Sequence, residues 1–258
     1  MVTQFTELTD SQWEVMKDVF NHQRKRKHNL REVVNALFFI LRTGLQWRNL
    51  PRNFPKWTIV YYYFRHWQKD GTIEILNMYL VELERQAWDK EATPSIICLD
   101  SQSVKSAPMV KEGRGLDPFK KVNGRKRHIA SDTLGLILDV SVAAANSSDA
   151  VEGCKIMKRS SDLWSRLLKV LVDGAYQGQF LSWVKENTGA LVEIASRPPT
   201  QKGFVPIKWR WVVERTFSWF NFFRRLSKDY EKTTESSKAW ILLANCSVIV
   251  NRFRCEPN

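Results

Sequence analysis

The stretch RKRHIASDTLGLILDVSVAA, residues 125–144, decides the fold class of this chain. Side chains at 125–132 alternate as they do along a strand, and Thr133 to Gly135 form a turn into an apolar strand at 136–144. Two strands joined by a short turn that contains glycine predict a β-hairpin. The sequence on both sides indicates what this hairpin belongs to.

Short apolar runs around the hairpin predict the other strands of a sheet. They are SIICLDS at 95–101, LLKVLVD at 167–173 and ALVEIAS at 190–196. Helices are expected at about 149–165, near 179–187, around Glu214 and at about 236–253. This order of elements predicts an α/β fold in which a mixed sheet is flanked by helices.

Residues 1–91 predict a small all-helical domain, which leaves 92–258 as the domain that contains the sheet. Helices are expected to begin at Thr9 or Ser11, to run from Asn29 to Gly44, and to cover about 58–69 and about 72–88. Ser11 and Glu14 fit a capping box for the first helix. Short helices with tight basic connections favour a helix-turn-helix-like DNA-binding domain, although any small helical bundle fits the same pattern.

The charge balance favours a polyanionic partner. The chain has 258 residues, with 40 Lys and Arg against 27 Asp and Glu, a formal net charge of +13. Because the positive charge is clustered, we favour nucleic acid over a protein that is merely basic and soluble, and over a membrane surface. The chain contains no run of about 18 apolar residues that could span a bilayer. Its first residues also lack the pattern of a secretory signal. We therefore expect a cytoplasmic, nucleoid-associated protein.

The cysteines do not indicate a metal site. Cys98, Cys154, Cys246 and Cys255 form no Cys-x-x-Cys pair. Cys98 lies in an apolar strand pattern and Cys246 in an apolar helix pattern. Free, buried thiols in a reducing compartment are therefore expected, without a zinc site.

Three acidic residues are the candidate catalytic and metal-binding residues. Asp100 and Asp173 lie at or just past the ends of expected strands, and Glu214 lies in an expected helix. A single aspartate at a strand end is usually a turn or cap residue. Three carboxylates brought together by two strands and a helix suit two divalent cations such as Mg²⁺. In a chain with this positive charge, such a site predicts cutting and joining of nucleic-acid phosphodiesters.

Basic residues near these carboxylates are the candidate DNA contacts. Lys120, Lys121, Arg125, Lys126, Arg127 and His128 form a dense basic segment. On a strand, Arg125 and Arg127 face one way and Lys126 and His128 the other, so one face turns toward the site or the solvent. His128 equally fits a core histidine with satisfied hydrogen bonds.

Further candidate DNA contacts lie on the expected helices. Arg210 is four residues before Glu214, so the two share a helical face, and an arginine there can fix the carboxylate or reach a phosphate. Arg224 and Arg225 lie about one turn beyond Asn221, where they fit phosphate contacts or a solvated face equally well. Arg65, in the expected third helix, completes the set.

Several segments carry a resemblance to a known family. They are LDSQSVK around Asp100, residues 120–149, LVDGAYQG around Asp173 and residues 210–231, with LTDSQW, LRTGLQWRNLP and RHWQKDG in the helical part. Together they resemble the bacterial insertion-sequence transposases of the DDE superfamily, in the "insertion sequence five" group. GRKRHI followed by Arg-x-x-x-Glu is the most specific part of the resemblance, which covers nearly the whole chain.

The resemblance implies an RNase H-like catalytic fold that depends on Mg²⁺ or Mn²⁺. It also implies action on double-stranded DNA: cleavage at the inverted terminal repeats of the element and strand transfer into target DNA. Because two transposon ends must be held together, the mechanism leads us to expect a homodimer. Residues 174–213 are too few to hold a large insertion domain between Asp173 and Glu214.

One departure from the family pattern concerns the helix of Glu214. Related transposases have Tyr-x-x-Arg-x-x-x-Glu followed by a lysine seven positions later, whereas this chain has Ile207 and Asn221 at the tyrosine and lysine positions. Arg224 and Arg225 are candidates to take over the phosphate contact. A hydrolytic nuclease or resolvase with the same fold, and a domesticated DNA-binding protein without catalysis, are the alternative functions.

Overall fold

The computed structural model describes residues 5–20, 27–195 and 210–253, with the side chain of Arg210 left out. Its helices are α1 (Asp10–Met16), α2 (Leu30–Thr43), α3 (Trp57–Lys69), α4 (Thr72–Ala87), α5 (Asp149–Ser160), α6 (Gln179–Thr188), α7 (Arg210–Trp219) and α8 (Thr234–Arg252). Its strands are β1 (Ile96–Lys105), β2 (Gly115–Asp117), β3 (Val122–Asp132), β4 (Ile137–Ala144), β5 (Lys169–Val172) and β6 (Leu191–Ile194). The expected order of elements is confirmed, and β2 is an addition to it.

The helices of the N-terminal part begin and end where local side chains favour it. The capping box of α1 is formed by Thr9 and Gln12, so the expected pair of Ser11 and Glu14 was wrong. Asn29 caps α2 by accepting the backbone N–H of Arg31 at 2.9 Å. Gly44 ends α2 in the left-handed conformation, with φ 70°, which glycine adopts without steric cost.

The strands form one mixed sheet in the order β2-β3-β1-β5-β6, with β4 also paired to β3. β3 is antiparallel to β1, β2 and β4, whereas β5 is parallel to β1 and β6. The predicted hairpin is β3–β4. Asp132 builds its turn by accepting the N–H groups of Leu134 and Leu136, both at 2.9 Å, and Gly135 has φ 78°.

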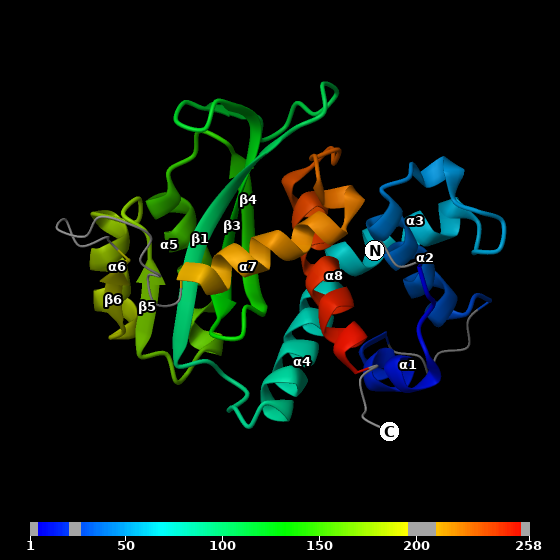
Figure 1. Cartoon of the computed structure of the whole chain (residues 1–258), viewed down its shortest axis with the longest axis horizontal. Helices are drawn as coiled ribbons and strands as arrows, with labels where there is room; N and C mark the ends of the chain where they lie inside the picture. Colours follow the sequence, from blue (N-terminus) through cyan, green and yellow to red (C-terminus); the bar gives the residue numbers. More distant parts are fainter. Residues whose placement is uncertain (1–4, 21–26, 196–209, 254–258) are drawn as a thin grey trace.

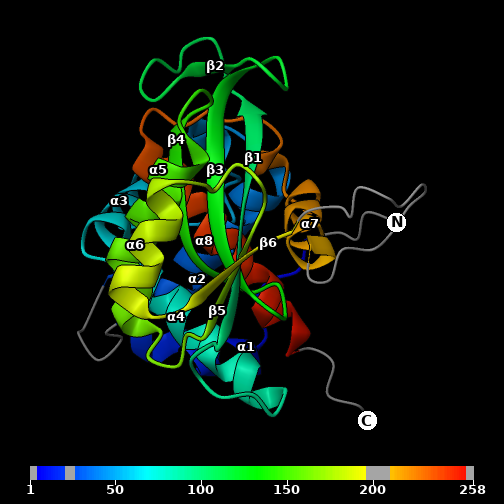
Figure 2. The same ribbon diagram turned by 90° about the vertical axis from the view of Figure 1, so that its left-hand side faces the viewer.

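Helices cover both faces of the sheet (Figures 1 and 2). α5 and α6 pack on one face, where Ile97 and Leu99 of β1 contribute to an apolar core. Cys98 of β1 belongs to a second core on the opposite face, with residues of α7 and α8. This alternation along β1 fixes which face each of its polar side chains joins.

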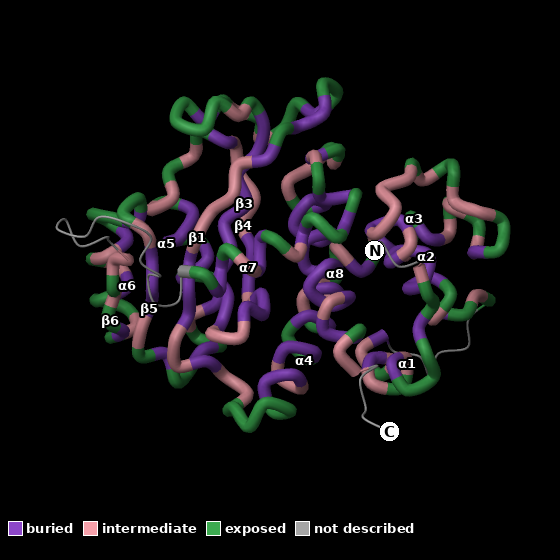
Figure 3. The backbone as a smooth tube through the Cα atoms, viewed as in Figure 1, coloured by how far each residue is buried: buried purple, intermediate pink, exposed green. Residues whose placement is uncertain are grey.

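The N-terminal helices share the second core with the sheet and with α8, as the buried positions in Figure 3 indicate. Buried polar contacts reinforce this packing: Arg85 of α4 pairs with Asp132 of β3. The side-chain amide of Asn77 donates to the carbonyl of Ile137 at 2.8 Å. A domain boundary after residue 91 stays a prediction, and in the structure the two parts pack through a common interior.

The cysteines within the described ranges are free and buried, namely Cys98, Cys154 and Cys246, as the sequence predicted. Burial raises the pKa of Cys98 to about 12, so this thiol stays protonated. No helix within the described part of the chain is long and apolar enough to cross a membrane.

Candidate active site

Asp100 and Asp173 lie beside each other at the centre of the sheet. The parallel register of β1 and β5 pairs Cys98 with Leu171. Two residues further along both strands come Asp100, within β1, and Asp173, one residue past the end of β5. Both side chains are half-buried. The two expected carboxylates are therefore neighbours at the carboxyl end of β5.

Side-chain alternation assigns both aspartates to the face that α7 covers. They share parity with Cys98 and Leu171, which belong to the core that includes Val213 and Phe217 of α7. α7 packs against β1, and Figure 1 shows this helix crossing that strand. α7 thus packs on the face to which both aspartates are assigned, and a site shared by the three carboxylates stays a prediction.

Glu214 lies on an exposed position of α7, next to the buried Val213. Among the residues that the structure describes, no group of three His, Cys, Asp or Glu lies close enough to hold a metal ion. The structure therefore aligns Asp100 with Asp173 and packs the helix of Glu214 on the same strand, without closing the three carboxylates into a ligand cluster.

The chemistry of this end of the sheet fits a divalent cation. Carboxylate oxygens are the ligands that Mg²⁺ prefers. Tyr176, three residues after Asp173, is fully buried and its hydroxyl has no hydrogen-bond partner. Burial raises the pKa of Tyr176 well above its ordinary value, and the negative charges of Asp100, Asp149 and Asp173 raise it further. Negative charge from these carboxylates therefore acts on the buried Tyr176 hydroxyl.

Lys126 and His128 lie on the opposite face of the sheet, where both meet Asp149 at the start of α5. The Lys126 ammonium is 3.3 Å from Asp149 Oδ1, and His128 Nδ1 is 3.4 Å from the same atom. Burial lowers the pKa of His128 to about 4, although Asp149 opposes the shift. His128 is therefore neutral near pH 7 and buried, which corrects its expected role as a DNA contact.

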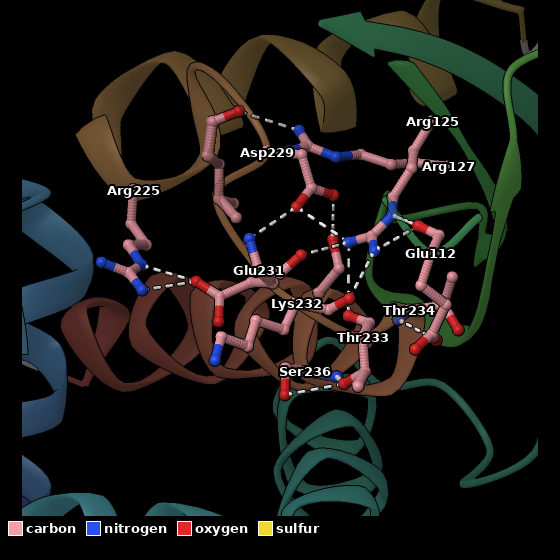
Figure 4. A network of polar contacts seen from close by, with 12 residues as sticks. Glu112, Arg125, Arg127, Arg225, Asp229, Glu231, Lys232, Thr233, Thr234 and Ser236 are labelled. Carbon is pink, nitrogen blue, oxygen red and sulfur yellow. Dashed lines mark hydrogen bonds and ion pairs between the residues drawn. The ribbon is translucent and has the colours of Figure 1, made fainter. Parts of the chain in front are cut away.

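Arg125 and Arg127 point to the α7–α8 face, so their predicted separation from Lys126 and His128 is confirmed. Arg125 pairs with Asp229 at 3.0 Å and donates to the backbone carbonyls of Glu112 and Lys232 (Figure 4). Both oxygens belong to loops that flank β3. Because Arg125 is inaccessible to solvent, its expected contact with DNA is corrected to an internal anchor.

Arg127 and Arg225 are anchors of the same kind. Arg127 Nη1 donates to the carbonyl of Leu226 at 2.9 Å, and burial lowers its pKa to about 10. Arg225 pairs with Glu231 (Figure 4). Its guanidinium carbon also lies 5.2 Å from the ring centroid of Trp240. Both side chains are buried, so neither reaches DNA in this arrangement.

The remaining basic candidates differ in exposure. Lys120, Lys121 and Arg224 are exposed. Arg65 is half-buried, and its guanidinium donates to Gln68 Oε1 at 3.3 Å. Lys126 keeps only a small exposed fraction, 9%.

The departures from the family pattern lie at the two ends of α7. Ile207 lies outside the described residues, as does the side chain of Arg210. Asn221 is exposed in a short 3₁₀ turn (Phe220–Phe222) that follows the end of α7 at Trp219. The position that holds lysine in related transposases is therefore beyond the α-helix of Glu214 in this chain.

Tyr176 is the residue at this site that the sequence did not single out. Its position in the sequence Asp-Gly-Ala-Tyr could have indicated it, because an aromatic residue three positions after a strand-end carboxylate is close enough to pack near it. Gly153 of α5 makes room for the ring, since a Cβ there would lie 2.8 Å from it.

Comparison with known families decides where this arrangement belongs. The family described as "Transposase DDE domain" matches residues 91–249, which include all of β1 to β6 and the three acidic residues. The chain belongs to the DDE transposase domain family. The mixed sheet with its flanking helices is accordingly the RNase H-like fold of that family. A second family, described as "Putative transposase of IS4/5 family", matches residues 8–77 of this DDE transposase domain protein.

A curated relative agrees with this family. The chain is 28% identical over 138 residues to "Putative transposase for insertion sequence element IS402" of Burkholderia cepacia. The similarity covers 51% of the chain and 65% of that relative.

Proposed function

We propose that this protein is a DNA transposase that cuts and joins DNA at the inverted terminal repeats of its own insertion sequence. The observation that carries the proposal is the alignment of Asp100 with Asp173 on the face where α7 packs against β1. It gathers two carboxylates at one point and brings the helix of Glu214 to the same strand. The family of the chain supports the same activity.

The proposed cofactors are two divalent cations, Mg²⁺ or Mn²⁺, held by Asp100, Asp173 and Glu214. When bound, such ions supply Lewis-acid stabilisation of charge on the phosphate and activation of the attacking oxygen. The chain itself orients two of the ligands. Asp100 Oδ1 accepts the N–H of Ser101 at 2.7 Å, and Asp173 Oδ1 accepts the N–H of Ala175 at 2.9 Å. Each carboxylate retains lone pairs for a cation beside such a bond.

We further propose that exposed basic side chains hold the DNA backbone. Lys120, Lys121 and Arg224 are available for this role, and Arg65 and Arg210 are secondary candidates. The buried Arg125, Arg127 and Arg225 are not part of the proposed interface. The two DNA substrates are the terminal repeats and the target, with two copies of the protein holding two ends, and the cytoplasmic nucleoid as the place of action.

Strand transfer tests this proposal. The full chain is mixed with a duplex that ends in the terminal repeat, with supercoiled target DNA and Mg²⁺. Asp100→Asn, Asp173→Asn and Glu214→Gln should each lower joined product by at least 100-fold, because each removes a metal ligand. Glu186→Gln changes an exposed acid on α6 and should keep wild-type activity. Wild-type activity in all three site variants would refute the assignment.

The products separate this function from its alternatives. A nuclease or resolvase would give hydrolysed ends without joined product. A DNA-binding protein without catalysis would give neither, and it would bind no divalent cation in a calorimetric titration.

A further inference from the structure

Phe119 is an aromatic side chain that is almost fully exposed to solvent. It lies in the turn between β2 and β3 (residues 118–121), and 94% of its surface is exposed. β2 and its adjoining loops project beyond the rest of the sheet (Figure 2). An aromatic ring contributes 150–250 Å² of contact area when it is covered, so its exposure on a projecting turn suits a partner with a flat, apolar face.

The turn that presents Phe119 is built from defined polar contacts. Asp117 is buried, and its Oδ1 accepts the backbone N–H groups of Phe119 and Lys120, both at 3.0 Å. Its Oδ2 accepts the hydroxyl of Ser103 on β1. Lys121 adopts a positive φ of 52°, which closes the turn. These bonds hold the backbone at Phe119 in one conformation.

The surroundings of Phe119 are positively charged. Exposed cations of this projection are Lys105, Lys111, Arg114, Lys120 and Lys121. Of the two acidic residues in the same stretch, Asp117 is buried in the turn, and Glu112 accepts the N–H of Thr234 at 3.2 Å. Aromatic rings framed by cations are the pattern that binds bases and phosphates together.

The turn is also tied to the strand that carries Asp100. The Lys120 ammonium is 3.4 Å from the carbonyl oxygen of Ser101, the residue after Asp100. Ser103, two residues further along β1, holds Asp117. DNA that contacts the turn would therefore run close to the proposed catalytic carboxylates.

We propose that Phe119 stacks on an unpaired base of the DNA next to the cleavage position, while Lys120 and Lys121 bind the flanking phosphates. The inference rests on the proposed function and adds a recognition element for distorted or single-stranded ends. The positive charge of the projection selects a nucleic-acid partner over a second protein surface. Stacking of one base on an aromatic side chain contributes about 1–3 kcal/mol, which corresponds to about 5- to 150-fold in affinity.

Binding to two DNA molecules tests the proposal. The full chain is titrated, with EDTA present, against a blunt terminal-repeat duplex and the same duplex with a short single-stranded end. Phe119→Ala should lower affinity for the second DNA by about 10-fold and leave the first unchanged. Phe119→Tyr should retain the preference. Met109→Ala removes another exposed apolar side chain of the projection, 70% exposed, and should have no effect.

Other variants and outcomes complete the test. Lys120→Gln with Lys121→Gln should weaken binding to both DNAs and reduce the salt dependence, since phosphate contacts carry no base preference. Equal loss on both DNAs with Phe119→Ala, or no loss, would overturn the inference. Light scattering of the protein without DNA gives a further outcome. If the Phe119→Ala protein forms a smaller assembly than wild type, the ring mediates contact between copies of the chain, and the inference is also overturned.

The two proposals fail in different ways. If wild type joins DNA and the Phe119→Ala variant still prefers the duplex with a single-stranded end, only the stacking role is refuted. If wild type prefers the duplex with a single-stranded end through Phe119 but joins no DNA, only the transposase activity is refuted. Absence of any DNA binding refutes both.

Discussion

At the residue scale, Arg125 is a buried cation that ties β3 to two loops. Its guanidinium contacts Asp229 and the backbone of Glu112, Glu231 and Lys232. Removing one partner of a buried ion pair leaves the other charge without compensation, which costs about 3–5 kcal/mol. The basic stretch that looks like a DNA-binding segment in the sequence thus contributes to stability from inside.

Replacement of Arg125 tests this role. Arg125→Met should lower the free energy of unfolding by about 3–5 kcal/mol, because Asp229 stays buried without its partner. Urea unfolding measures the change, and Lys120→Gln on the exposed turn should shift stability by less than about 0.5 kcal/mol. A stable Arg125→Met protein with weakened DNA binding would show instead that this arginine contacts DNA.

His128 makes stability depend on pH. Its pKa is lowered by burial from 6.5 to about 4 in the folded protein, with Asp149, Glu152 and Lys126 facing it. Between these values the unfolded chain binds a proton that the folded chain does not. Stability from this residue is therefore present above about pH 6.5 and is lost as the pH falls toward 4.

The comparison with a variant isolates this effect. His128→Gln should flatten the dependence of the free energy of unfolding on pH between 6.5 and 4, measured by urea titration at several pH values. If wild type and variant keep the same slope over this range, His128 is not the group that titrates.

At the scale of elements, the β3–β4 turn positions α7. Thr216 Oγ1 donates to the carbonyl of Gly135 at 2.8 Å, and Arg215 Nη2 donates to that of Leu134 at 2.9 Å. Asp132 stabilises the same turn by accepting the backbone N–H groups of Leu134 and Leu136. The hairpin that decides the fold therefore also places the helix that carries Glu214.

Gly135 and Gly71 provide a matched pair to test this coupling. Both have positive φ, but a Cβ at Gly135 would lie 2.8 Å from Thr216 Oγ1, whereas Gly71 has nothing within 4 Å. Either change to alanine should cost about 1 kcal/mol of backbone strain. Gly135→Ala should in addition displace α7 and lower strand transfer by about 10-fold, with Gly71→Ala near wild type. Equal activity of the two variants would separate α7 from the turn.

The sequence predicts the elements well and the environment of charged side chains poorly. Apolar runs located β1, β4, β5 and β6. Strand alternation located β3 and assigned Arg125 and Lys126 to opposite faces. β2 escaped because three residues are too short for a periodic signal. The burial of Arg125 was not predictable, because its ion-pair partner Asp229 lies 104 residues away along the chain. Asp229 meets Arg125 only after the segment before α8 packs on the sheet.

At the scale of the whole molecule, the helical part, the sheet and α8 surround a common core. Trp240 of α8 packs on Phe64 of α3, with ring centroids 4.7 Å apart, and Arg85 of α4 meets Asp132 at the hairpin. The strands with Asp100 and Asp173 and the helix with Glu214 rest on this interior. We expect the core to keep the carboxylates in place while DNA and cations bind at the surface.

Cation binding tests the central claim, the three-carboxylate metal site, most directly. Mn²⁺ is titrated into the full chain bound to terminal-repeat DNA, and electron paramagnetic resonance measures the bound ion. Wild type and Glu186→Gln should bind Mn²⁺ alike, whereas Asp100→Asn, Asp173→Asn and Glu214→Gln should each lower affinity by at least 10-fold. Wild-type Mn²⁺ binding in all three site variants would contradict the account.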